Sequence, residues 1–220
     1  MQLVDIGANL THASFQPDLP QVLARARAAG VAVLVTGTSA EETRKALALG
    51  FHTTAGVHPH HARDCGPQTI PELRELAKDS RVVAIGEYGL DFNRNYSPHP
   101  DQEKWFVAQV ELALEVGKPL FLHSRDAHPR FSEILRNFRI EKAVAHCFTG
   151  ERDELHASLD LGLYVGNTGW ICDERRGRHL VELVRDIPRD RLLLETDAPY
   201  LTPRDLRPQP KARRNEPAFL

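Results

Sequence analysis

Short apolar runs alternate with amphipathic segments along the whole chain. An apolar run of strand length is typical of a buried parallel strand, whereas apolar residues spaced three and four positions apart indicate a helix. We expect strands in the apolar runs at 3–9, 31–38, 51–58, 82–92, 119–128, 142–150, 163–170 and 192–197. Helical spacing is found at 18–29, 39–49, 69–76, 100–116, 152–161 and 179–187. The chain therefore repeats a strand-and-helix unit.

Local signals mark where several of these helices begin and end. Ser39 with Glu42, and Thr69 with Glu72, have the spacing of a capping box, in which the two side chains bind backbone N–H groups of the first turn. Gly117 follows the longest helical segment, and glycine favours the position after a helix C-terminus. These signals support separate helices between the strands.

This repeat predicts an α/β fold, a (β/α)8 TIM barrel in which eight strands alternate with helical segments. An open, doubly wound sheet is the alternative, but it usually has a glycine-rich phosphate-binding turn after its first strand, and none follows here. We expect residues 1–220 to form a single barrel domain. A loop rich in proline and arginine runs from Asp197 to Leu220, so we expect the eighth helix to be missing and to leave the first and last strands partly uncovered.

The composition is that of an ordinary globular protein, with 41% hydrophobic and 26% charged residues. No apolar run approaches the about 18 residues of a membrane span, and the N-terminus lacks the basic start and apolar stretch of a signal peptide. Cys65, Cys147 and Cys172 show no CxxC spacing, so we expect free thiols and no metal thiolate. A cytoplasmic protein with no membrane partner is predicted.

The formal net charge is −2 with 11 histidines counted as neutral. Such a chain has no overall positive field that would attract a nucleic acid. A nucleic-acid enzyme of this composition would have to bind its substrate through local basic patches and metal.

In four of the expected strands the apolar run breaks at a residue type that binds metal: Glu87, His123, His146 and Asp197. In a parallel barrel the carboxyl ends of the strands meet at one face and carry the active site. Two imidazoles and two carboxylates suit Mg²⁺, Mn²⁺, Zn²⁺ or Fe²⁺. Each residue alone has an ordinary explanation, a core or loop histidine or an aspartate in a turn. Their corresponding positions at four strand ends favour a shared metal site.

Several motifs together resemble the TatD family of metal-dependent deoxyribonucleases, and the resemblance covers essentially the whole chain. They are GVHPHHA, AIGEYGLDFNRN, FLHSRDAH, HCFTG, TGWICDERRG, LLLETDAPYLTPRDL and RRNEP. The resemblance implies a TIM barrel of the metal-dependent hydrolase type that cleaves phosphodiester bonds, and it places the same four residues on the family's metal positions. It also implies a 3′–5′ exonuclease acting on single-stranded DNA, with RNA as a second substrate. DNA repair and the clearing of degraded DNA are both compatible roles.

The end of the first strand departs from the wider family pattern. Many relatives have a His-x-His pair there, whereas this chain has Gly7, Ala8 and Asn9, as the TatD subgroup does. The loss of two imidazoles shifts the site towards oxygen ligands, so we expect Mg²⁺, with Mn²⁺ or Zn²⁺ as alternatives. Asn9 is a candidate oxygen ligand, or it caps the loop.

Glu87 and Asp197 are the candidate catalytic residues. Asp197 would accept a proton from the attacking water, and Glu87 would bridge two metals if two are bound. His58 and His60 lie at the end of the third strand and are candidate hydrogen-bond donors to the substrate's phosphates. The resemblance implies that His58 faces the substrate. His60 is equally well explained as a surface residue. Arg125 would bind phosphate or pair with a neighbouring aspartate.

Basic and aromatic residues in the later loops are candidate DNA contacts. Arg175 with Arg176, and Arg213 with Arg214, form two basic pairs that would supply a local patch, although such pairs are usually solvated surface. Trp170 would stack on a base or pack beneath its loop.

Two other readings stay open. The same barrel serves amide, ester and lactone hydrolysis, including the deacylation of aminoacyl-tRNA, although Glu87 stands where two-metal amidohydrolases are expected to have a carbamylated lysine. A truncated, inactive nucleic-acid binder is the non-enzymatic reading, and four intact ligand-type residues argue against it. No obligate protein partner is predicted.

Overall fold

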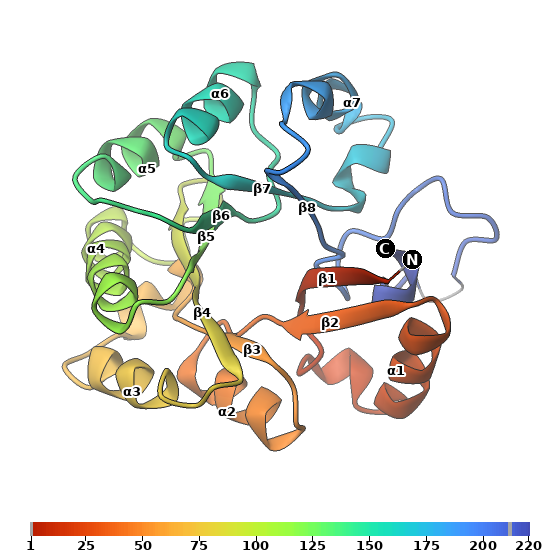
Figure 1. Cartoon of the computed structure of the whole chain (residues 1–220), viewed down its shortest axis with the longest axis horizontal. Coiled ribbons are helices and arrows are strands. Elements are labelled where there is room, and N and C mark those ends of the chain that lie inside the picture. Colours follow the sequence, from red (N-terminus) through yellow and green to blue (C-terminus); the bar gives the residue numbers. More distant parts are fainter. Residues whose placement is uncertain (1, 211–212) are drawn as a thin grey trace.

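The computed structural model describes residues 2–210 and 213–220, and its strands form one parallel sheet curved into a barrel (Figure 1). Each strand pairs with the next along the chain, as the sequence pattern predicts for a TIM barrel. The strands are β1 (Leu3–Ala8), β2 (Val31–Val35), β3 (Thr53–Ala55), β4 (Val82–Asp91), β5 (Leu120–Arg125), β6 (Ala143–Ala145), β7 (Tyr164–Asn167) and β8 (Leu192–Leu194). The predicted fold is therefore confirmed.

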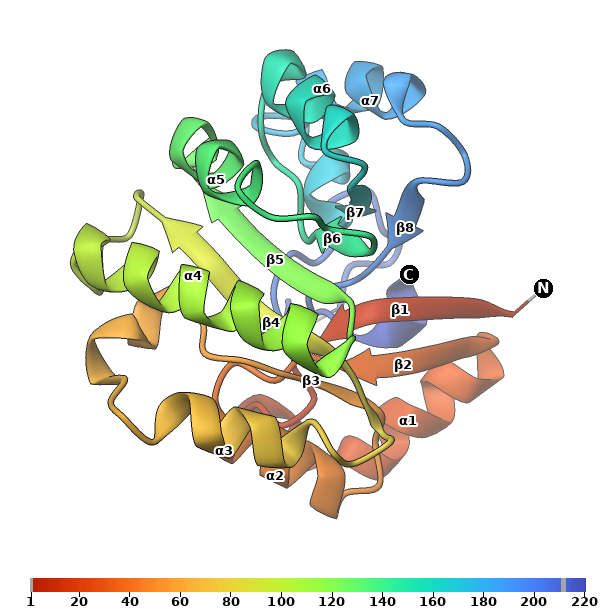
Figure 2. The same cartoon turned by 60° about the vertical axis from the view of Figure 1, so that its left-hand side comes forward.

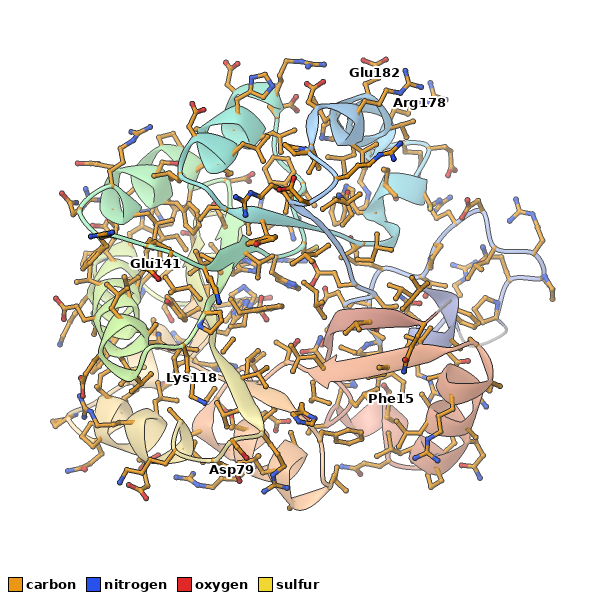
Figure 3. All side chains as sticks on the ribbon, in the orientation of Figure 1. Phe15, Asp79, Lys118, Glu141, Arg178 and Glu182 are labelled. Atoms are coloured by element: carbon orange, nitrogen blue, oxygen red, sulfur yellow. The ribbon has the colours of Figure 1, made fainter. Side chains whose placement is uncertain are left out.

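Helices surround the barrel, and the turned view in Figure 2 shows α4 crossing β4, with α3 below it. Exposed side chains such as those of Arg178 and Glu182 point outwards (Figure 3). The α-helices are α1 (Leu19–Ala28), α2 (Ala40–Ala48), α3 (Thr69–Leu76), α4 (His99–Val116), α5 (His128–Leu135), α6 (Arg152–Asp160) and α7 (Arg178–Leu183). Short 3₁₀ helices are η1 (Ala13–Phe15), η2 (Pro59–Asp64), η3 (Gly169–Cys172), η4 (Val184–Asp186) and η5 (Pro217–Phe219). None of the described helices is long and apolar enough to cross a membrane.

The helix signals in the sequence are partly correct. Ser39 caps α2, because its side chain accepts a hydrogen bond from the Glu42 backbone N–H at 3.2 Å. Thr69 does not cap α3: it is the first helical residue, and its hydroxyl instead accepts from the Gly66 backbone N–H at 3.0 Å. The apolar spacing located no helix between the fifth and sixth strands, where the structure has α5.

The largest apolar cluster lies between β4, β5 and the helices α3 to α5. Tyr88, Phe106 and Phe131 are fully buried in it, with ring centroids 5.8 Å and 5.4 Å apart in succession. Two buried glutamines of α4 also bind the backbone at strand ends: Gln109 accepts from the Val57 N–H at 2.7 Å, and Gln102 accepts from the Asp91 N–H at 2.8 Å. Packing and hydrogen bonds therefore fix the ends of β3 and β4.

The barrel closes between β8 and β1 through a buried carboxylate. No strand ladder joins these two strands in the described residues. Asp5, with no exposed surface, accepts from the Thr196 N–H at 2.9 Å, the Gly7 N–H at 3.2 Å and the Thr196 hydroxyl. Just beyond, the Asp197 N–H donates to the Gly7 carbonyl at 2.8 Å. A side chain thus supplies the bonds that a ladder would otherwise make.

The outer faces of β1 and β8 are partly uncovered, as expected from the sequence. Val4 on β1 is 52% exposed and Leu194 on β8 is 40% exposed. In the described part of the chain, β8 is followed by a long loop and η5, and Glu216 ties this segment to Arg25 of α1 with two hydrogen bonds of 2.7 and 2.6 Å. No α-helix covers this edge within those residues.

Asp5→Asn is expected to change how stability depends on pH. Burial raises the pKa of Asp5 to about 7, above the about 3.9 of an unfolded aspartate, so the folded state binds the extra proton and the parent's free energy of unfolding falls as pH rises from about 4 to about 7. Asparagine keeps the acceptor without a charge. In urea unfolding at several pH values, the variant should gain a few kcal/mol relative to the parent across this window. A constant difference would contradict the assignment.

Candidate active site

The four predicted ligand residues meet at the carboxyl ends of the strands. Glu87 lies on β4 at an irregular register, where Gly86 pairs with Phe121 but Tyr88 pairs with the next residue of β5. Such a bulge re-aims the inserted side chain. Gly89 has a φ of +149° and passes so close to the His123 carbonyl that a Cβ atom would overlap it. The local sequence therefore lets β4 approach β5 closely while Glu87 turns into the barrel mouth.

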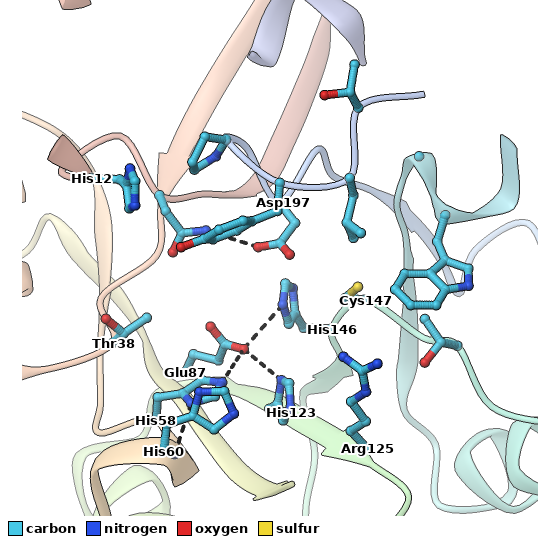
Figure 4. Close-up of a pocket in the computed structure, with 18 of the residues that line it drawn as sticks. His12, Thr38, His58, His60, Glu87, His123, Arg125, His146, Cys147 and Asp197 are labelled. Atoms are coloured by element: carbon cyan, nitrogen blue, oxygen red, sulfur yellow. Dashed lines mark hydrogen bonds and ion pairs between the residues drawn. The ribbon is translucent and has the colours of Figure 1, made fainter. Parts of the chain in front are cut away.

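One carboxylate oxygen is surrounded by three imidazoles (Figure 4). Glu87 Oε1 lies 2.9 Å from His123 Nδ1, 3.3 Å from His146 Nε2 and 3.4 Å from His58 Nε2. Although burial acts to raise it, the pKa of the Glu87 carboxyl is held well below its usual range by His146, His58 and the bond from His123. Glu87 is therefore ionised and ready to face a cation.

Asp197 approaches the same space from β8 (Figure 4). Its Oδ1 accepts a hydrogen bond of 3.0 Å from Asn9 Nδ2, so Asn9 orients the carboxylate. Burial raises the pKa of Asp197 to about 7. Ligand atoms of Asp197, His146 and Cys147 lie within 4.8 Å of one another, as do those of His58, Glu87 and His123. The sequence predicts a free thiol and no metal thiolate at Cys147, but its sulfur lies in the first of these clusters, and burial raises the pKa of the thiol to about 12.

Two buried acids that the sequence prediction missed stand behind the histidines. Glu195 Oε2 is 2.6 Å from His146 Nδ1. Asp91 Oδ2 is 2.6 Å from His60 Nε2 and 3.7 Å from His123 Nε2. Asp91 lies on β4 with Glu87, and Glu195 follows β8 two residues before Asp197, so an acid near the end of an apolar run was the available signal. The spacing alone does not tell which acid faces the centre and which supports a neighbour.

The residues present fit a divalent cation. Carboxylate oxygens and imidazole nitrogens are ligands for Mg²⁺, Mn²⁺ and Zn²⁺. His146 Nδ1 donates its proton in the hydrogen bond to Glu195. A neutral His146 would therefore direct the Nε2 lone pair at Glu87 Oε1, so that two hydrogen-bond acceptors would face each other at 3.3 Å. A positive charge resolves this contact. Glu195 and Glu87 indeed raise the pKa of His146 well above its usual range against the effect of burial, so either a proton or a metal ion belongs there.

The centre lies at the bottom of a cleft of about 1910 Å³. Pockets for small ligands typically measure about 300–1,000 Å³, so this cleft has room for a segment of a polymer. Its lining includes many cationic side chains and three large aromatic ones. They are Lys45, Arg94, Arg125, Arg175, Arg176, Arg204, Arg207 and Arg213, with Tyr96, Trp170 and Tyr200.

Comparison with known proteins agrees with this geometry. The model of the family described as TatD related DNase matches residues 4–220. The chain belongs to this family. A relative from Edwardsiella piscicida, named 3′-5′ ssDNA/RNA exonuclease TatD, is 54% identical over 227 residues, covering 99% of this chain and 87% of its own length. A relative of the same name from Pantoea sp. (strain At-9b) is 56% identical with the same coverage.

Solved structures of TatD proteins share the fold. A TatD homologue from Escherichia coli K12 superposes with a TM-score of 0.88 at 27% identity, covering 98% of this chain and 85% of its own. A TatD family hydrolase from Entamoeba histolytica superposes with a TM-score of 0.90 at 27% identity, covering 100% of this chain and 88% of its own. The resemblance inferred from the motifs is thus confirmed for the family and the barrel.

Among the basic residues of this TatD chain, Arg214 lies apart from the cleft. It binds Asp18 with two hydrogen bonds of 2.8 and 2.7 Å, and its guanidinium lies 4.8 Å from the centre of the Phe15 ring. Arg213, by contrast, is exposed and lines the cleft. The two members of this basic pair therefore point to different surroundings.

The other predicted contacts line the cleft. The guanidinium of Arg176 lies 4.4 Å from the centre of the Trp170 ring. The guanidinium of Arg125 lies 5.6 Å from the same ring centre. Arg176 also pairs with Asp173 at 2.9 Å, and Arg175 reaches the same aspartate at 3.6 Å. Trp170 is thus covered on at least one face by arginine.

Arg213→Ala and Arg214→Ala are expected to act differently. Removing Arg214 breaks a bidentate ion pair and should lower the free energy of unfolding by about 1–2 kcal/mol without changing KM. Removing Arg213 should leave the free energy of unfolding within about 0.5 kcal/mol of the parent's. It should weaken binding of single-stranded DNA and lower the slope of log affinity against log salt concentration by about one, the loss of one phosphate contact. Chemical unfolding and fluorescence anisotropy at several salt concentrations measure both. Loss of DNA affinity in a stable Arg214→Ala variant would reverse the assignment.

Proposed function

We propose that this chain is a metal-dependent nuclease that hydrolyses phosphodiester bonds, acting as a 3′–5′ exonuclease on single-stranded DNA and, secondarily, on RNA. The observation that carries the proposal is the convergence of three imidazoles on Glu87 at the base of a large, arginine-lined cleft. Full-length relatives named as 3′-5′ ssDNA/RNA exonucleases support the substrate and polarity. Residues 1–220 act as one catalytic domain in this proposal.

Glu87, His123, His146 and Asp197 would hold the cation. Mg²⁺ is the preferred ion in this proposal because Gly7 and Asn9 supply no imidazole from β1, and Mn²⁺ and Zn²⁺ are alternatives. When bound, a divalent cation supplies Lewis-acid activation of water and offsets charge on the phosphate oxygens.

Asp197 is proposed as the general base. A base is most effective when its pKa lies near the operating pH, and burial raises the pKa of Asp197 to about 7. The hydrogen bond from Asn9 fixes which carboxylate oxygen is free to accept a proton from the attacking water. Asn9 is therefore assigned an orienting role rather than a ligand role.

His58 and His60 are assigned to the substrate side of the cleft. Burial lowers the pKa of His58 to about 4, so its ring is neutral and can donate one N–H to a phosphate oxygen. His60 is anchored by Asp91 and packs edge-on against the exposed Tyr96 ring at 4.7 Å. Arg125, Arg175 and Arg213 would neutralise phosphates, and Trp170 would stack on a base.

One nuclease assay tests the proposal against its two alternatives, an acyl hydrolase and an inactive nucleic-acid binder. The purified chain should release the label of a 3′-labelled single-stranded oligonucleotide as a mononucleotide in its first cleavage. Chelation with EDTA should stop the reaction, and Mg²⁺, Mn²⁺ or Zn²⁺ should restore it to different extents. A 5′-labelled strand should yield a ladder of shortening products. Absence of cleavage with every metal, by a folded chain, would exclude the nuclease. Cytoplasmic location and a role in DNA repair stay predictions.

Asp197→Asn is expected to lower kcat by about 10²–10⁴-fold, because the amide accepts no proton. The amide preserves the size of the side chain, so circular dichroism should match the parent. Asp190→Asn is the matched control, since Asp190 is exposed and precedes β8 at its other end. Equal kcat for Asp197→Asn and the parent would remove Asp197 from the mechanism.

A further inference from the structure

The three imidazoles around Glu87 differ in the groups that lie behind them. We propose that these hydrogen bonds decide which histidine binds metal: Glu195 holds His146 as a ligand through Nε2, whereas the His60 backbone holds His58 as a proton donor outside the ligand set. Glu195 is thus a positioning residue. The proposal rests on the proposed metal-dependent function.

Glu195 is held rigidly in a closed slot. Its side chain has no exposed surface, and both oxygens are used: Oε2 meets His146 Nδ1 at 2.6 Å, and Oε1 accepts from the Cys147 backbone N–H at 2.6 Å. Glycines line the slot. A Cβ at Gly7 would lie 2.5 Å from Oε2, and one at Gly166 would overlap Oε1. Gly7 of β1, Gly166 of β7 and the Cys147 backbone after β6 together therefore fix this carboxylate against the ring of His146.

This contact determines the tautomer of His146. A carboxylate only accepts hydrogen bonds, so Nδ1 of His146 must carry the proton. The remaining nitrogen, Nε2, then offers its lone pair towards Glu87 Oε1, 3.3 Å away. A carboxylate behind a metal-binding imidazole commonly fixes the ligand's tautomer and raises its basicity. His146 is therefore oriented as a metal ligand before any metal binds.

His58 has the opposite arrangement. Its Nδ1 accepts a hydrogen bond of 3.1 Å from the backbone N–H of His60, a group that can only donate. A neutral His58 must then carry its proton on Nε2, the atom that faces Glu87 at 3.4 Å. No lone pair is left on that side for a metal. His58 lies as close to Glu87 as a ligand would, yet its ring presents an N–H donor suited to a phosphate oxygen.

His123 follows the pattern of His146 with a looser partner. Asp91 Oδ2 faces His123 Nε2 at 3.7 Å, and Nδ1 lies 2.9 Å from Glu87. Within the described residues, Nε2 of His123 is buried without a hydrogen-bond partner. In the structure Nδ1 carries the proton that Glu87 accepts, so freeing Nδ1 as a ligand needs a rotation of the ring towards Asp91 together with transfer of the proton to Nε2. The two proposed histidine ligands thus have a buried acid behind them, and His58 does not.

Glu195→Gln tests the proposal with little change in shape. If glutamine keeps the bond from the Cys147 N–H, its amide group points an N–H at His146 Nδ1, which favours the tautomer protonated on Nε2 and removes the lone pair. Calorimetric titration of the full chain with Mn²⁺ should show an affinity about 10–100-fold weaker than that of the parent. Glu216→Gln is the matched control, because Glu216 is 4% exposed and pairs with Arg25, not with a histidine. It should bind Mn²⁺ like the parent.

His58→Gln and His146→Gln complete the test and do not depend on Glu195→Gln folding. His58→Gln should keep the Mn²⁺ affinity of the parent within about 3-fold while losing nuclease activity, whereas His146→Gln should lose both. Parent-like Mn²⁺ affinity in Glu195→Gln, or a large loss in His58→Gln, would overturn the proposal. Mn²⁺ binding is measured without substrate, so the two hypotheses can fail separately. If the variants show the expected Mn²⁺ affinities but the parent does not cleave DNA, the nuclease function is refuted and the assignment of the histidines stands.

Discussion

The site depends on how the barrel is closed between β8 and β1. Asp5 bonds the backbone and hydroxyl of Thr196, and Thr196 lies between Glu195 and Asp197 in the chain. Fixing this one residue therefore sets the depth and direction of the acid that supports His146 and of the acid that faces the cleft. A buried carboxylate has one set of donors, and losing them costs several kcal/mol.

Buried acids concentrate at the carboxyl end of the barrel. Glu87, Asp91 and Glu195 are each at most 4% exposed, and close like charges are costly in a protein interior. Backbone N–H groups and imidazoles offset much of this cost, since Asp91 accepts from two backbone N–H groups and Glu195 from one. The remaining negative charge faces the centre. In the proposed function, this uncompensated negative charge is what would attract a cation to the cleft.

The chain has a net negative charge, yet its proposed substrate is an anionic polymer, and the cationic surface around the centre explains how the two can bind. Cationic side chains gather on the cleft, while other arginines are used in structure: Arg25 and Arg214 tie the C-terminal segment to α1 and its preceding loop through Glu216 and Asp18. Net charge describes the whole surface, but a bound strand responds to charges within about 10 Å of it at physiological salt. A local patch is therefore sufficient.

The periodic apolar pattern determined the barrel, and with it the meeting of Glu87, His123, His146 and Asp197, because parallel strands that repeat in order must place their ends on one rim. It did not determine the partners. Gly7, Gly166 and Glu195 form one slot although they lie far apart in the chain, and adjacent arginines at 213 and 214 turn to different neighbours. Strand spacing fixes which end of the barrel a residue occupies. Which acid faces the cation and which stands behind a histidine depends on bulges and on donors brought by other strands, so only the tertiary structure decided it.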